Sequence, residues 1–173
     1  RSLRERMTEA AWLREIEGQY VADDTAVFRW EDIQAAYEAA DWELPVKPTE
    51  RDLQARRYVA GWDLAKTTDW TVGIVLDATE KPYRLVHFER FQRAPWPVVA
   101  KRIREVHGRY NCHVSLIDAT GVGAPILDEV RDVAQGFTFT GRSKVDLLTG
   151  LQVALERRWL RFPFVQDLVD ELQ

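Results

Sequence analysis

The chain has 173 residues, enough for one sizeable domain and an appendage, and its 46% hydrophobic and 30% charged residues are typical of a globular protein. No apolar run approaches the roughly 18 residues of a membrane span, and the single cysteine, Cys112, excludes an internal disulfide and a cysteine zinc site and fits a reducing compartment. The net charge of −4 means that any nucleic-acid binding must rest on a local basic patch.

The first fifty residues indicate two short helices followed by a linker. Apolar residues recur at helical spacing over residues 8–20 and again over about 31–40. Residues 41–52 contain prolines among charged residues, which indicates a linker. Because these segments are too short to bury their own apolar faces, we expect residues 1–50 to pack against another domain.

Strand patterns begin after residue 56. Apolar runs rich in branched and aromatic residues predict strands over 57–64 and 71–76, and a less buried strand over 83–91. The turns between these runs are short, so we expect the three strands to form an antiparallel meander.

Helices and strands alternate after this meander. Ser143 is the predicted N-cap of a helix whose core stripe is Leu148, Leu151 and Leu155. The predicted elements are a helix over 95–110, a strand over 113–118, a helix from about 125, a strand over 136–140, a helix over 143–158, a short extended piece over 159–162 and a last helix over 165–173.

The order β-β-β-α-β-α-β-α resembles the ribonuclease H-like fold. This is an α/β fold with a mixed sheet, three antiparallel strands and then parallel strands, flanked by helices; here a short helical N-terminal extension precedes it. In that layout the first strand is central and the fourth lies parallel beside it, and right-handed crossovers leave few other topologies. The strands that end at Asp63 and Asp118 are therefore predicted neighbours.

Asp63 and Asp118 each end a predicted strand and come before a polar turn. In parallel neighbours both carboxylates reach the same edge, where like charges repel and a divalent cation is favoured. Two such ions could activate a water and hold a phosphate. The alternative is that both residues are exposed strand-end aspartates that order the following turns. Asp69 is either a further ligand, through water, or a hairpin-turn residue.

Other candidates could contact phosphate. Thr120, Gly121 and Gly123 lie before a predicted helix whose first N–H groups could bind an anion, although an ordinary turn explains them equally well. Arg142 and Lys144 flank the predicted cap and could contact a DNA backbone, or could simply be solvated. The remaining basic clusters are interpreted as solvated helix faces, the three histidines as bystanders, and the seven tryptophans as core and interface residues.

Several blocks of this sequence resemble, in the same order, the C-terminal nuclease domain of the large terminase subunit of tailed bacteriophages. By position, Asp63 and Asp118 match two metal-binding aspartates of that family, and Asp69 matches a further acidic position. The likeness covers about residues 56–173, while residues 1–50 resemble the end of the preceding ATPase region and its linker. The matching blocks are 58–65 (YVAGWDLA), 69–71 (DWT), 116–123 (LIDATGVG), Ser143-Lys144 and 159–163 (WLRFP).

The resemblance implies a two-metal-ion endonuclease, a phosphodiester hydrolase that uses Mg²⁺ or Mn²⁺ to cut concatemeric double-stranded viral DNA during genome packaging in the host bacterial cytoplasm. It implies the terminase ATPase domain, the small terminase subunit and the portal protein as partners, and no membrane. No GxxxxGK[ST] motif appears, so this chain lacks the packaging ATPase site. The family's last catalytic carboxylate comes from a later helix, so we expect the nuclease domain, residues 51–173, to be truncated at its C-terminus.

Two other interpretations stay open. A non-catalytic DNA-binding or assembly module with an incomplete site is favoured by the acidic net charge and the missing carboxylate. An actin-like ATPase fragment is suggested because both strand–aspartate–turn segments are similar to phosphate-binding hairpins on the same sheet order. Those ATPases need a second domain to close over the nucleotide, and this chain has no sign of one.

Overall fold

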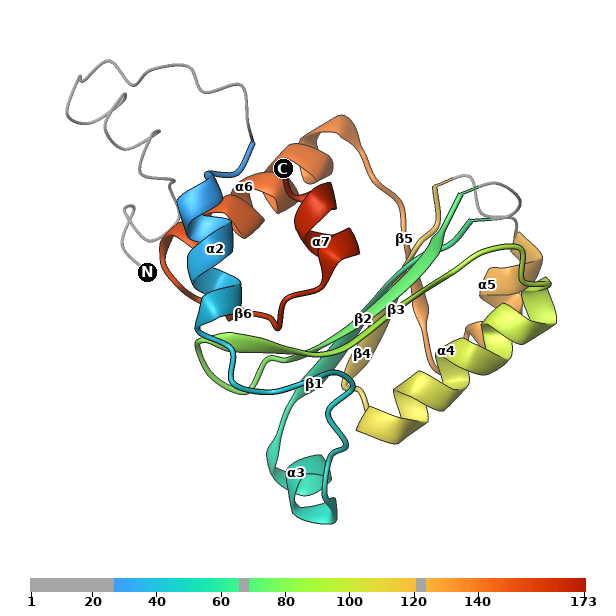
Figure 1. Cartoon of the computed structure of the whole chain (residues 1–173). Coiled ribbons are helices and arrows are strands. Elements are labelled where there is room, and N and C mark those ends of the chain that lie inside the picture. The colour runs from blue at the N-terminus through green and yellow to red at the C-terminus, as the bar shows by residue number, and fades with distance from the viewer. Residues whose placement is uncertain (1–26, 66–68, 121–123) are drawn as a thin grey trace. The chain divides into compact units, whose positions relative to one another are not determined.

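The computed structural model describes residues 27–65, 69–120 and 124–173 (Figure 1). The helix predicted over residues 8–20 lies outside these ranges. The described residues form two compact units: Trp42–Phe139, here the sheet unit, and the residues up to Asp41 together with Thr140–Gln173, here the helical unit. Within the described ranges, no helix is long and apolar enough to cross a membrane.

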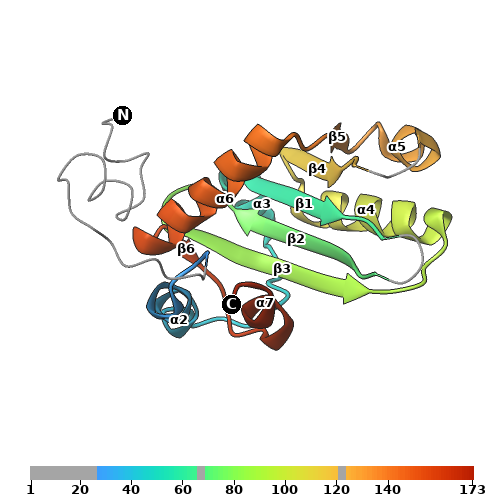
Figure 2. The ribbon, with the colours of Figure 1, turned by 90° about the horizontal axis from the view of Figure 1, so that it is seen from above.

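The sheet unit is built on a mixed sheet with the strand order β5-β4-β1-β2-β3. β1 pairs antiparallel with β2 and parallel with β4, and the arrowheads of β1 and β2 in Figure 2 point in opposite directions. This order confirms the predicted mixed sheet, with the first strand central and the fourth beside it. The strands are β1 (Tyr58–Asp63), β2 (Thr71–Asp77), β3 (Tyr83–Phe91), β4 (Val114–Asp118) and β5 (Gln135–Phe137).

Helices α4 (Trp96–Tyr110) and α5 (Ala124–Val130) cover one face of this sheet. Pro95 is the N-cap of α4, and the helix ends at Asn111, which adopts the left-handed conformation with φ 47°. The apolar residues of this helix at helical spacing are fully buried in one core cluster with Trp62 of β1 and Ile117 of β4; they are Val99, Ile103, Val106 and Tyr110. The hydrophobic core therefore lies between the sheet and α4, and it leaves the other face of each strand for other roles.

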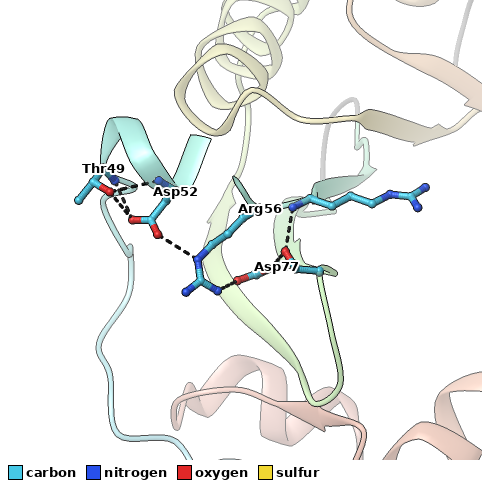
Figure 3. Close-up of polar contacts among 6 residues, drawn as sticks. Thr49, Asp52, Arg56 and Asp77 are labelled. Carbon is cyan, nitrogen blue, oxygen red and sulfur yellow. Dashed lines mark hydrogen bonds and ion pairs between the residues drawn. The ribbon is translucent and has the colours of Figure 1, made fainter. Parts of the chain in front are cut away.

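A polar network joins the short helix α3 (Glu50–Ala55) to β2 (Figure 3). Thr49 caps α3 in a reciprocal capping box with Asp52. Arg56 donates from Nε to Asp52 at 3.0 Å and from Nη1 to the buried Asp77 at 2.6 Å. The predicted linker therefore ends earlier than residue 52, because the Thr49-x-x-Asp52 pair starts a helix at Glu50.

The helical unit contains α2 (Trp30–Glu38), α6 (Gly141–Glu156), β6 (Leu160–Arg161) and α7 (Gln166–Glu171). Its buried side chains come from each helix and from the segment after α6. The backbone N–H of Phe162 donates to the carbonyl of Ala36 at 3.3 Å, and Arg158 donates to Asp32 at 2.6 Å. The buried apolar residues of this unit are Phe28, Ile33, Ala36, Val153, Leu155, Phe162 and Val169.

Three sequence predictions are corrected here. The N-cap of α6 is Thr140, whose hydroxyl accepts from the N–H of Ser143, so Ser143 is the third helical residue instead of the cap. Leu148 is 39% exposed, because only the C-terminal half of α6 carries buried residues. The fifth strand ends at Phe137, since β4 offers pairing partners only as far as Asp118.

Candidate metal centre

Asp63 and Asp118 are the last residues of two adjacent parallel strands. Trp62 lies opposite Ile117, so the two aspartates occupy the next position on each strand. Both Trp62 and Ile117 are buried against α4, and side chains alternate along a strand. The sheet therefore brings both carboxylates to one edge and to the same face, the face opposite α4.

A glycine in the neighbouring strand fixes the end of β1. Trp62 pairs with Gly73 of β2, and a Cβ at position 73 would lie 2.4 Å from Cζ3 of the indole. The indole thus occupies the space that any other side chain at position 73 would fill. This packing anchors β1 one residue before Asp63.

The Asp63 carboxylate is disfavoured as an anion. Burial raises its pKa above the usual 3.8, and the negative charges of Asp118 and Asp69 raise the pKa further. Among the described residues, no hydrogen-bond donor or cation lowers the pKa of Asp63. A divalent cation would relieve the repulsion, and carboxylate oxygens are ligands that Mg²⁺ and Mn²⁺ prefer, so the residues fit such an ion.

Asp118 also orders the turn that follows β4. Its Oδ1 accepts from the backbone N–H of Thr120 at 2.7 Å, and the Thr120 hydroxyl accepts from the N–H of Phe139 at 3.3 Å. The turn-ordering role considered for Asp118 is thus present. A carboxylate has about four acceptor positions, so this bond leaves capacity for a cation as well.

Asp69 is exposed and lies just before β2. Its charge reaches Asp63, yet no group of three or more His, Cys, Asp or Glu side chains converges as a metal cluster in the part of the chain that the structure describes. The described centre is therefore a carboxylate pair with a more distant third charge, and a metal-ligand role for Asp69 stays a prediction.

The remaining predicted contacts are Thr120, which is bonded to Asp118, two residues of the helical unit, and two residues outside the described ranges. Gly121 and Gly123 lie outside those ranges. Arg142 and Lys144 are exposed in the first turn of α6, in the helical unit. A phosphate contact by Thr120 would have to compete with its internal hydrogen bonds. All of these assignments stay predictions.

Trp70 is a residue that the sequence interpretation missed. The tryptophans were interpreted as core and interface residues, which holds for Trp62, but Trp70 is 43% exposed. The guanidinium carbon of Arg90 lies 4.5 Å from the centre of its ring. The available sequence signal was its position directly after Asp69, in a polar turn at the edge that carries Asp63.

A comparison with known protein families decides the family of this chain. Residues 60–170 match the model of the terminase RNaseH-like domain. The chain belongs to this family. The match confirms the ribonuclease H-like fold class and the predicted relation to large terminase nucleases. Among curated proteins, no match is found for this terminase domain.

Solved structures of phage terminases share the fold. The large terminase nuclease of thermophilic phage G20c with bound magnesium has a TM-score of 0.69 and 23% identity, over 85% of this chain and 78% of that chain. The large terminase nuclease domain of Thermus phage P74-26 has a TM-score of 0.66 and 23% identity, over 85% of this chain and 76% of that chain. The HK97 bacteriophage large terminase has a TM-score of 0.61 and 11% identity, over 83% of this chain and 35% of that chain. In another G20c nuclease structure, this domain spans 64% of the length of that chain.

Proposed function

We propose that this terminase domain is a metal-dependent endonuclease that cuts double-stranded DNA, and that its substrate is concatemeric viral DNA during genome packaging. The observation that carries the proposal is the placement of Asp63 and Asp118 at one edge and on one face of the sheet, with the pKa of Asp63 raised. The G20c nuclease, a protein of the same fold, has been solved with bound magnesium, zinc and cobalt, which supports divalent-metal binding here.

The residues of this chain have defined tasks in such a reaction. Asp63 and Asp118 would hold two Mg²⁺ or Mn²⁺ ions, with Asp69 as a further ligand. When bound, these ions supply an activated water and neutralise charge at the phosphate. The chain itself contributes a rigid edge: β1 is fixed by Trp62, and the turn after Asp118 is fixed by its bond to Thr120.

We propose the wider setting from the family. Residues 1–50 would correspond to the end of a terminase ATPase region and its linker, and residues 51–173 to the nuclease domain. The host cytoplasm would be the site of action. The proposed partners are double-stranded DNA, the terminase ATPase domain, the small terminase subunit and the portal protein, and the proposed phosphate contacts are Thr120, Gly121, Gly123, Arg142 and Lys144.

The test is cleavage of supercoiled plasmid with Mn²⁺ or Mg²⁺. We expect nicked and linear products from the wild-type chain and a loss of about 100-fold or more in Asp63→Asn and in Asp118→Asn. Asp128→Asn, which removes an exposed carboxylate of α5, is the matched control and should cleave like the wild type. Cleavage that survives in Asp63→Asn would contradict the assignment of the site.

A thermal-shift experiment separates the remaining functions. Mn²⁺ should raise the melting temperature of the wild type and should lose this effect in Asp63→Asn. Stabilisation by nucleotide instead of by the metal alone would favour an actin-like ATPase. A clear Mn²⁺ shift without any plasmid cleavage would favour a non-catalytic module with a metal site.

A further inference from the structure

A single row of residues crosses the face of the sheet that carries the carboxylates. Asp63 of β1 pairs with Val72 of β2, and Val72 pairs with Arg90 of β3. Asp118 of β4 extends the row on the other side, one position after the pair of Trp62 and Ile117. Strands lie about 4.8 Å apart, so Arg90 is roughly 10 Å from Asp63 along this row.

The alternation of side chains places Arg90 on the same face as Asp63. Its chain neighbours Glu89 and Phe91 both face α4: Glu89 accepts from Arg102 of that helix at 2.6 Å, and Phe91 packs against the core. Arg90 must then project from the opposite face. The row therefore runs from two carboxylates to a guanidinium on one face.

Trp70 lies next to the Arg90 end of this row and is exposed to solvent. It lies two residues before Val72, and the Arg90 guanidinium lies over its ring, while 43% of the residue stays exposed. A cation–π contact of this kind helps to hold the indole in place. A large aromatic ring that is held yet solvent-exposed offers a flat surface to a ligand.

The chemistry of the row fits a DNA strand that passes along it. The paired carboxylates repel phosphate, so they offer no contact to DNA without cations. The indole, by contrast, offers a flat face on which a base can stack, and the positive charge of Arg90 next to it attracts phosphate. The rise between successive nucleotides is about 3.4 Å, so a site roughly 10 Å away corresponds to a nucleotide a few positions from the cleaved bond.

We propose that Trp70, held by Arg90, is a stacking platform for an unpaired nucleotide of the DNA, a few positions from the cleaved phosphate. This inference rests on the proposed nuclease function and adds a substrate-positioning residue to it. Trp70 then contributes to DNA affinity through its ring, independently of the bond-breaking step. Because stacking tolerates any base, its contribution does not depend on sequence.

The test measures DNA affinity without cleavage. The full chain with Asp63→Asn, in Mg²⁺, is titrated against a fluorescein-labelled duplex with a short single-stranded gap, and anisotropy gives Kd. Adding Trp70→Ala should raise Kd roughly tenfold. Trp30→Ala removes a tryptophan of the helical unit with the same 43% exposure and should leave Kd unchanged.

Two further variants keep the test decisive if Trp70→Ala lowers the melting temperature. Trp70→Phe retains an aromatic face and should bind within about threefold of the parent, whereas Trp70→Leu retains apolar volume alone and should bind like Trp70→Ala. Equal affinity of the Leu and Phe variants would overturn the stacking role.

The outcomes also separate this inference from the function on which it rests. Unchanged Kd in Trp70→Ala, together with metal-dependent cleavage that is lost in Asp63→Asn, would overturn the inference and leave the nuclease intact. A parent chain that does not bind DNA would overturn both. A tenfold loss of affinity in Trp70→Ala, in a protein that does not cleave, would support the platform in a DNA-binding module.

Discussion

Asp63 carries a negative charge at a place where the protein disfavours one. Burial and the charges of Asp118 and Asp69 raise its pKa, and the described residues provide no compensating donor. A binding site of this kind trades folding stability for affinity toward a cation.

The stability cost should appear in the pH dependence. With its pKa raised in the folded state, Asp63 binds more protons folded than unfolded, so stability falls as pH rises through the interval above 3.8. Asp63→Asn should therefore melt roughly 1–3 °C higher than the wild type at pH 7 in EDTA, a small effect because Asp63 is only partly buried and solvent still screens the repulsion. The difference should vanish toward pH 3.

Melting curves from pH 3 to pH 8 would check this expectation. Asp128→Asn serves as the control and should follow the wild type at every pH, because Asp128 is an exposed helix residue. Added Mn²⁺ should reverse the order by stabilising only the wild type. An Asp63→Asn protein that melts below the wild type at pH 7 would show that Asp63 supports the fold.

At the scale of elements, the helices that could be predicted from the sequence are those with a buried apolar face. The α4 helix could be predicted because Val99, Ile103 and Val106 repeat at helical spacing and are fully buried. The α3 helix could not, because none of its residues is buried and it leaves no apolar period. Only its capping box marked it, and that signal is short and easily taken for a turn.

The N-cap of α6 shows a different limit on prediction from sequence. Thr140 and Ser143 form a reciprocal box, so either hydroxyl residue could have been the cap from sequence alone. The extended backbone of Thr140, φ −106° and ψ 163°, decides between them. In the candidate site, the edge position of Asp63 and Asp118 followed from strand order. The contact of Trp70 with Arg90 did not, because Arg90 lies on the neighbouring strand β3, 20 residues later in the sequence.

The packing of β1 on β2 gives a test at the same scale. Gly73→Ala should lower the free energy of unfolding by about 1–3 kcal/mol, because the new methyl group would collide with the buried indole of Trp62. Gly61→Ala on β1 is the matched control: its Cβ would lie 3.6 Å from Cγ1 of Ile74, an ordinary contact, and should cost much less. Urea denaturation measures both. Equal losses would show that strand glycine itself, and not the indole, is responsible.

At the scale of the molecule, one ion pair joins segments at the two ends of the described chain. Arg158 donates to Asp32, whose side chain is only 3% exposed, and Arg29 donates to the same carboxylate. Burial raises the pKa of Asp32, but the hydrogen bonds from Arg29 and Arg158 outweigh it, so the net pKa is lowered. The pair thus ties α2 to Arg158, two residues after the end of α6, within the helical unit.

Arg158→Ala should destabilise the chain by about 1–3 kcal/mol at pH 7, since Arg29 remains as a partner for the buried carboxylate. A lowered folded pKa gives stability that is present above the usual 3.8 and lost as pH falls, so the loss should shrink toward pH 3. Arg142→Ala, at an exposed position of the same unit, is the control in urea denaturation. A pH-independent loss would point to packing of the arginine stem.

The pairing of Trp62 with Gly73 also fixes the register of β1 against β2. A slip of β1 by one residue would turn Asp63 toward α4, away from the face on which Asp118 lies. A slip of two residues would keep the faces but would place the indole opposite Thr71 or Val75, both of which are buried and carry a side chain where Gly73 has none. The bulky ring of Trp62 and the absence of a side chain at Gly73 thereby determine the position of the carboxylate at the end of β1.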